Sequence, residues 1–206
     1  TKQLLIMSGT SVSRVGAIGS HGQTLLHSPD TEPAFTLQLG DPSTIATNTG
    51  IPTVADFRAM DMALGGQGAP LAPAFHNVAF RSTHETRAVI NIGGISNITL
   101  LPQVSDAPVI GFDSGPGNTL LDGWYQRHHS GSYDIDGAWA ATGLANPALL
   151  RQCLSEPYFE EAFPKSTGRD LFNLAWLEQK AGDLLQNLEP ADVQSSLLVL
   201  TVESIA

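Results

Sequence analysis

The sequence predicts an α/β protein with mixed β-sheets, and two observations support this class. From Arg87 onward, short apolar runs typical of strands alternate with segments whose apolar residues recur at helical spacing. The chain has 206 residues, of which 42% are hydrophobic and 15% are charged, so it can bury a core in one large domain or two smaller lobes. Because the strand pattern restarts at Arg87, we predict a first lobe at residues 1–86 and a second at residues 87–206.

Apolar runs in the first lobe predict short strands that end in small, polar turns. We expect strands at residues 4–7, 15–18 and 35–39. Asp41 and Pro42 then predict the start of a helix that runs to about residue 49, because an acidic cap followed by proline favours helix initiation.

The second lobe is predicted to begin with three strands, at residues 88–92, 98–101 and 109–112. Helices follow at 118–129 and 147–154, the latter opened by Asn146 and Pro147, and Pro190 opens a last helical segment. Leucines at helical spacing between residues 171 and 188 predict one long amphipathic helix. Its apolar stripe faces the core in the simplest interpretation, and a homodimer surface is the alternative.

The segment VIGFDSGPGNTLL places a carboxylate at the end of an apolar strand, immediately before glycines. Gly115, Pro116 and Gly117 predict a tight turn, and Asn118 can cap the following helix, so backbone N–H groups would converge near Asp113. A base and an anion would then share one pocket. The alternative is that Asp113 is only a turn or cap residue.

Composition excludes several classes of function. Ten basic against twenty acidic residues give a formal net charge of -10, which disfavours attraction to nucleic acids and to anionic membranes. No apolar run approaches the ~20 residues of a membrane span, and the opening TKQLLIMSG does not read as a signal peptide. Cys153 is the one cysteine, so no internal disulfide forms, and we interpret it as a packing residue of a cytoplasmic protein.

Histidines do not predict a metal site. His76, His84, His128 and His129 lack the spacing and the acidic companions of a metal cluster, so no protein-held metal is expected. For the acids near glycine loops, such as Asp61 and Asp122, we expect capping or solvent-facing roles.

Six segments follow one another in an order that resembles a known family. They are IMSGTS (6–11), AIGSHGQTLLH (17–27), VADFRAMDMALGGQGAPLAP (54–73), NIGGISN (91–97), GFDSGPGN (111–118) and PKSTGRDLFN (164–173). One glycine turn would be weak evidence, but six in register span nearly the whole sequence. The chain resembles the anhydro-N-acetylmuramic acid kinases, bacterial enzymes of the actin-like and sugar-kinase ATPase superfamily. The resemblance implies a two-lobed actin-like (ribonuclease H-like) ATPase fold.

The resemblance also implies an activity. Members of this family bind ATP between two lobes, open the 1,6-anhydro bond of anhydro-N-acetylmuramic acid with water, and phosphorylate the freed O6. The product, N-acetylmuramic acid 6-phosphate, belongs to cell-wall recycling. By resemblance, Asp113 is the general base that takes a proton from the attacking water, a role that needs an ionised carboxylate held at a fixed distance.

The remaining site residues follow from the same motifs. Those implied for ATP, with Mg²⁺ carried by the nucleotide, are Gly9, Thr10 and Ser11 in a first phosphate loop, Gly93, Gly94 and Asn97 in a second, and Gly115, Gly117 and Asn118 beside Asp113. Those implied for the amino sugar are His21, Gln23, Thr24, Asp56, Arg58, Lys165 and Arg169. Arg58 is our first choice for direct sugar contact. His21 could instead bond its own loop, and Lys165 and Arg169 could lie in a solvated loop.

Two departures from the family pattern bear on activity. The first loop should continue past Ser11 into an acidic residue and glycine, but Val12, Ser13 and Arg14 follow here. The family also continues beyond the segment SIA (204–206) into a glycine-rich region that helps hold the adenosine half of ATP. We therefore expect both lobes to be incomplete, the first near residues 11–14 and the second at its C-terminal part. The alternative functions are a related kinase for another sugar and a sugar-binding module without catalysis.

Overall fold

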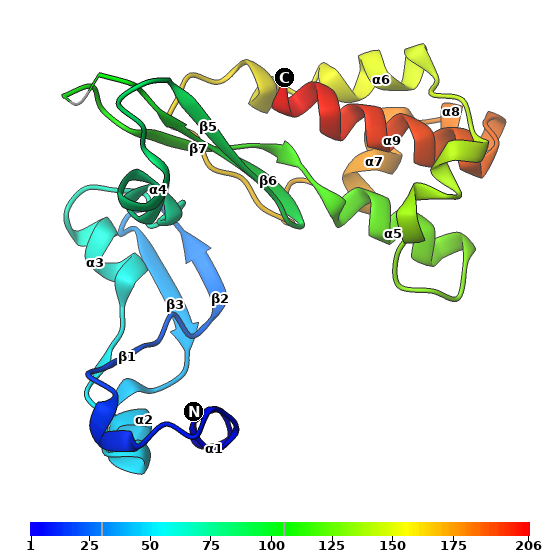
Figure 1. Cartoon of the computed structure of the whole chain (residues 1–206). Coiled ribbons are helices and arrows are strands. Elements are labelled where there is room, and N and C mark those ends of the chain that lie inside the picture. Colours follow the sequence, from blue (N-terminus) through cyan, green and yellow to red (C-terminus); the bar gives the residue numbers. More distant parts are fainter. Residues whose placement is uncertain (30, 105) are drawn as a thin grey trace. The chain divides into compact units, whose positions relative to one another are not determined.

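The computed structural model describes residues 1–29, 31–104 and 106–206. The chain forms two compact units, Thr1–Leu71 and Ala72–Ala206 (Figure 1). In the described residues, the first unit holds two two-stranded sheets, one parallel and one antiparallel, and the second holds a three-stranded antiparallel sheet. Helices accompany the sheets in both units, so the predicted α/β class is confirmed. The predicted mixed sheets are wrong for the described residues, because each sheet is purely parallel or purely antiparallel. The strands of the second unit follow one another directly along the chain, and such connections favour antiparallel pairing.

The first unit alternates short helices with short strands. Its elements are α1 (Lys2–Ser8), η1 (Val12–Arg14), β1 (Ile18–Gly19), β2 (Gln23–Ser28), β3 (Phe35–Leu39), α2 (Pro42–Thr49), β4 (Thr53–Val54) and α3 (Phe57–Ala63). Two predictions here are confirmed, because β3 spans residues 35–39 and α2 ends at Thr49. The Asp41 side chain accepts a hydrogen bond from the Thr44 backbone N–H at 2.6 Å, which caps α2.

Two strand predictions in the first unit are wrong. Residues 4–7 lie in helix α1, where Leu4 and Met7 are exposed and have no partner strand, so the helix satisfies its own backbone groups. Of the strand predicted at 15–18, only Ile18 joins β1. Its partner β4 begins after Pro52, which has no N–H to donate, and it is only two residues long.

The second unit begins with a helix and three strands, and helices make up most of the rest. Its elements are α4 (Ala72–Phe80), β5 (Arg87–Ile92), β6 (Ile95–Leu101), β7 (Ile110–Pro116), α5 (Asn118–His128), η2 (Ile135–Gly137), η3 (Ala140–Thr142), α6 (Pro147–Leu154), η4 (Pro157–Glu160), α7 (Leu174–Ala181), α8 (Leu184–Asn187) and α9 (Pro190–Ile205). The three strands pair in the order β5, β6, β7, each antiparallel to its neighbour. The helices predicted at 118–129, 147–154 and after Pro190 are confirmed.

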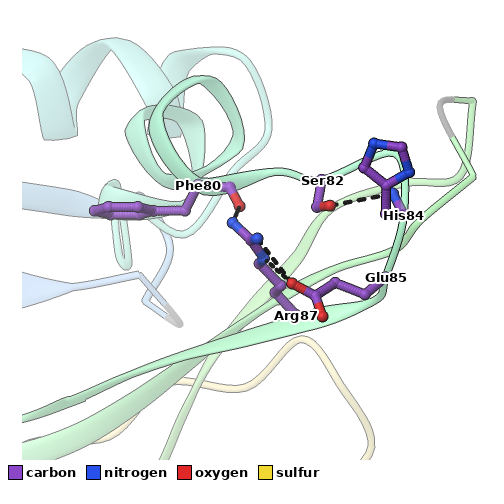
Figure 2. A network of polar contacts seen from close by, with 5 residues as sticks. All are labelled: Phe80, Ser82, His84, Glu85 and Arg87. Carbon is purple, nitrogen blue, oxygen red and sulfur yellow. Dashed lines mark hydrogen bonds and ion pairs between the residues drawn. The ribbon is translucent and has the colours of Figure 1, made fainter.

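Residues 72–86 pack within the second unit, whereas the sequence pattern divides the predicted lobes after residue 86. Helix α4 contacts β6, and His76 Nδ1 lies 2.8 Å from Thr99 Oγ1. The connection into β5 is held by Arg87, which pairs with Glu85 at 2.7 Å and donates to the Phe80 carbonyl at 2.9 Å (Figure 2).

A hydrophobic core joins the helices of the second unit. It includes Leu149 and Cys153 of α6, Leu177 of α7 and Leu197 of α9, each at most 1% exposed. The core-facing interpretation of the leucine stripe is therefore confirmed. Its prediction as one continuous helix is wrong, because α7 ends before Gly182, whose φ of 51° breaks the helical path before α8.

Cys153 provides a test of this core. Burial raises the pKa of its thiol to about 11, with Lys180 opposing the shift. At pH 8 we expect the folded protein to react with a thiol reagent about 100-fold more slowly than the unfolded protein, because the thiolate is the reactive form. Labelling with and without urea measures this ratio, and equal rates would contradict a buried Cys153.

Candidate functional site

Asp113 lies inside strand β7, not at its end as the sequence pattern predicted. The strand continues through Gly115 to Pro116, so the predicted tight turn at residues 115–117 is also wrong. Asp113 pairs with Asn97 of β6, and the register shifts between Ser96 and Asn97. Such a bulge redirects side chains locally, and Asp113 is 8% exposed.

A segment far along the chain holds Asp113 at four points. We call residues 158–167 the clamp segment. Ser166 Oγ and the Thr167 N–H donate to Asp113 Oδ2 at 3.1 and 3.0 Å. The Asp113 N–H donates to the Lys165 carbonyl at 3.0 Å, and the Tyr158 hydroxyl donates to the Asp113 carbonyl at 2.8 Å. Both the backbone and the carboxylate of Asp113 are thus oriented by one segment.

Lys165 is buried inside this segment, so the alternative of a solvated loop is wrong for it. Its ammonium group donates to the Tyr158 and Phe159 carbonyls at 2.8 and 3.1 Å and lies 4.7 Å from the centre of the Tyr158 ring. Burial lowers the pKa of Lys165, and the charge of Glu161 opposes that shift.

The glycine turn at residues 93–94 packs against the start of α5. The N–H groups of Gly117 and Thr119 donate to the Gly94 carbonyl, each at 3.0 Å, and the Asn118 N–H donates to the Gly93 carbonyl at 2.8 Å. The expectation that these donors converge on Asp113 is wrong, because they join the turn to the helix. Gly117, not Asn118, is the N-cap residue of α5, and no side chain caps that end.

Arg169 lies beside this turn. A Cβ atom placed on Gly94 would come within 3.0 Å of Arg169 Nη2 and 2.8 Å of Thr119 Oγ1. Arg169 also acts on Asp122: desolvation raises the pKa of that carboxyl, and the positive charge of Arg169 opposes the shift. The stretch that contains Lys165 and Arg169 therefore connects Asp113 with the glycine turn.

In the first unit, hydrogen bonds around Arg58 bring together two of the sequence motifs, those at residues 17–27 and 54–73. Its Nε donates to His21 Nε2 at 2.9 Å, and its Nη1 donates to the Gly68 carbonyl at 2.8 Å. The Gly68 N–H donates to Asp61 Oδ2 at 2.8 Å. His21 Nδ1 lies 2.9 Å from the Gly22 carbonyl, so the ring contacts its own loop as well as Arg58.

The other residues predicted in the first unit lie on separate elements. Gln23 and Thr24 begin β2, and Asp56 precedes α3 with a φ of 60°, which is uncommon for a residue other than glycine. Gly9 ends α1 in the left-handed region, and Thr10 and Ser11 follow it. The structure groups His21 with Arg58 directly.

Within residues 1–29, 31–104 and 106–206, no three histidine, cysteine or acidic side chains gather into a group that could hold a metal ion. Over the same ranges, none of the helices combines the length and the apolar character needed to cross a bilayer.

Comparison with known proteins gives the family. A family model described as anhydro-N-acetylmuramic acid kinase matches residues 1–206. The chain belongs to this family. It is 56% identical over 204 residues to a protein named anhydro-N-acetylmuramic acid kinase from Shewanella sediminis, covering 99% of this chain and 55% of that relative. It is 57% identical over 203 residues to the protein of the same name from Shewanella oneidensis, covering 98% and 54%. The chain thus spans about half the length of the curated relatives it matches.

In this member of the anhydro-N-acetylmuramic acid kinase family, three contacts of Asp113 were not among the predicted site residues. Ser166 and Thr167 lie within the PKSTGRDLFN motif, so the motif itself contained a signal for them. Tyr158 is 45 residues from Asp113 in the sequence, and no local pattern marks it. Contacts of that separation arise from the packing of the helices.

The close approach of Gly117 to Gly93 provides a test of the site. A Cβ atom at Gly117 would press against the Gly93 carbonyl oxygen, a backbone atom that cannot move aside easily. We expect Gly117→Ala to lower the free energy of unfolding by about 1–3 kcal/mol. Gly16→Ala is the control, because no atom lies within 4 Å of the added carbon. Urea denaturation measures both, and equal stabilities would contradict the contact.

Proposed function

We propose that the whole protein that carries this chain is an anhydro-N-acetylmuramic acid kinase. It would use ATP and water to open the 1,6-anhydro bond and phosphorylate O6, which gives N-acetylmuramic acid 6-phosphate for cell-wall recycling. Membership of the family supports this proposal, as do relatives at 56–57% identity that bear that name. The observation that carries it is the buried Asp113 carboxylate, held by Ser166 and Thr167 within a family motif.

Asp113 is the proposed general base. Its carboxylate would take a proton from water as the water oxygen bonds to the anomeric carbon and the bond from that carbon to O6 breaks. The freed O6 would then attack the terminal phosphoryl group of ATP. Two donors on Oδ2 favour the ionised carboxylate, because hydrogen bonds to the charged form stabilise it.

The ATP site in this proposal follows the glycine motifs. The proposed contacts are Gly9, Thr10, Ser11, Gly93, Gly94, Asn97, Gly115, Gly117 and Asn118, with Mg²⁺ carried by the nucleotide. Two buried hydroxyl groups near this region, Thr119 Oγ1 and Thr167 Oγ1, have no hydrogen-bond partner in the structure. Buried polar groups in a dry core are normally hydrogen-bonded, so two hydroxyl groups without a partner favour a site that binds a polar ligand.

The sugar site in this proposal centres on Arg58, whose guanidinium group suits the lactyl carboxylate of the substrate. The contact with His21 Nε2 orients it. The other proposed sugar residues are Gln23, Thr24, Asp56 and Arg169. The resemblance adds Lys165, although its ammonium group donates to two backbone carbonyls in this structure.

For the architecture, we propose the two-lobed actin-like fold of the superfamily. The α/β class and the family membership support it. An ATP-dependent step that consumes a free amino sugar belongs in the cytoplasm, where ATP is made. A homodimer and the absence of nucleic-acid partners are further parts of the proposal; the formal net charge of -10 supports the second.

Asp113→Asn tests the role of the base. In the whole protein we expect this change to lower turnover of anhydro-N-acetylmuramic acid by about 10²–10⁴-fold, because the amide cannot accept the proton. Calorimetry should give a nearly unchanged affinity for the sugar, since the amide keeps the shape of the side chain. Asp136→Asn is the control, because Asp136 is exposed at a φ of 56°, which asparagine tolerates. Turnover by Asp113→Asn close to that of the wild type would reject the assignment.

A substrate panel separates the proposed activity from its alternatives. With ATP and magnesium, we expect the whole protein to phosphorylate anhydro-N-acetylmuramic acid in preference to ordinary hexoses, as measured by ADP release and product mass. Phosphorylation of hexoses alone would indicate a different sugar kinase. Binding of the anhydro sugar without turnover would indicate a noncatalytic module.

A further inference from the structure

We propose that Tyr158 and Lys165 are positioning residues that fix the direction of the Asp113 carboxylate by holding the clamp segment against strand β7. This inference rests on the proposed function, in which Asp113 is the base. It assigns Tyr158 a role that the sequence motifs do not contain. It also assigns Lys165 to the positioning of the proposed base and not to the binding of the sugar.

The clamp segment holds the backbone of Asp113. In the described residues, β7 has β6 along one edge and no strand along the other. The N–H and the carbonyl of Asp113 bond to the Lys165 carbonyl and the Tyr158 hydroxyl, at 3.0 and 2.8 Å. The clamp segment therefore takes the place of a neighbouring strand at this residue, and both backbone dipoles of Asp113 are held.

The clamp segment also holds the carboxylate of Asp113. Ser166 and Thr167 follow Lys165 directly, and their donors both meet Oδ2. A shift of the clamp segment would therefore move the donors on Oδ2 and the backbone anchor together. Because proton transfer depends on distance and direction, such a shift alters the reaction more than it alters binding.

Internal contacts of Lys165 keep the clamp segment in shape. The Lys165 ammonium group donates to the carbonyls of Tyr158 and Phe159, which closes the segment onto its own beginning. The group also lies 4.7 Å from the Tyr158 ring centre and 5.8 Å from the Phe163 ring centre. These contacts hold the segment so that the Tyr158 hydroxyl and the donors of residues 166 and 167 all form hydrogen bonds with Asp113.

Protonation supports the role of Tyr158. Burial, with the negative charges of Asp113 and Glu161 adding to it, raises the pKa of the Tyr158 hydroxyl above its usual range. The hydroxyl therefore stays protonated and remains a donor to the Asp113 carbonyl across the neutral range.

A direct sugar contact by Lys165 fits the structure less well. The side chain is 6% exposed, and two backbone carbonyls take hydrogen bonds from its ammonium group. The hollow that it borders is lined mainly by apolar side chains, including Ile90, Ile98 and Phe112. A carbohydrate carboxylate would have to break the internal hydrogen bonds to reach the charge.

The experiment compares Tyr158→Phe and Lys165→Met with the wild type in the whole protein. Tyr158→Phe removes one hydroxyl and keeps the ring, and Lys165→Met removes the charge and keeps most of the length. We expect kcat to fall about tenfold or more for each, with the KM values for the anhydro sugar and for ATP nearly unchanged. Tyr133→Phe and Lys2→Met are the matched controls, because both residues are exposed, and we expect both to keep the wild-type kcat.

A double variant separates positioning from general damage to the fold. If Tyr158 acts through the Asp113 carboxylate, Tyr158→Phe should cost much less turnover in an Asp113→Asn background than in the wild type. A loss that only reflects poorer folding would appear in both backgrounds. If Lys165→Met does not fold, Tyr158→Phe and this double variant decide the question.

Each outcome has one meaning. A raised KM for the anhydro sugar with unchanged kcat would make Lys165 or Tyr158 a sugar contact and overturn the proposal. An unchanged kcat in both variants, or equal losses in the two backgrounds, would also overturn it. A wild-type protein that does not turn over the anhydro sugar, or a fully active Asp113→Asn, would instead refute the proposed function, and the positioning role would fall with it.

Discussion

Burial of the Asp113 carboxylate is the constraint on which the rest of the second unit depends. A charge that is 8% exposed is costly unless hydrogen bonds replace the water it has lost. Ser166 and Thr167 supply two such hydrogen bonds to Oδ2. A loop more than 50 residues farther along the chain thereby orients the acid.

Packing against the helical core holds that loop in place beside Asp113. Tyr158 is 4% exposed within the core cluster, and its ring meets Phe172 edge to face, with centroids 5.7 Å apart. Phe172 in turn packs against Trp176 of α7, with centroids 5.1 Å apart. The clamp segment is therefore anchored in the core, and its Tyr158 hydroxyl, Ser166 hydroxyl and Thr167 N–H bond to the strand. The apolar packing that stabilises the unit also sets the geometry of the carboxylate.

The first unit is organised by polar contacts more than by a core. Among the residues that the structure describes there, Ile51 is the hydrophobic residue that is buried. The Arg58 cluster is held by hydrogen bonds to His21 and to the Gly68 carbonyl, and Asp61 holds Gly68 in place. A guanidinium group fixed in this way keeps its planar fork in one orientation, which suits recognition of a carboxylate.

Local signals in the sequence were sufficient to predict helices whose starts are controlled by neighbouring residues. Asn146 with Pro147, and Asp41 with Pro42, open helices because the side chain and the ring act on the next few backbone groups. The motifs also indicated Asp113 and Arg58, whose roles in catalysis and sugar binding are proposals. The local pattern failed at residues 4–7 and 171–188, where a missing strand partner and the backbone angle of Gly182 decided the structure.

The contacts of Tyr158 and Lys165 depend on three-dimensional packing. Their shared partner Asp113 lies 45 residues before Tyr158 and 52 residues before Lys165, and only the folded core brings them together.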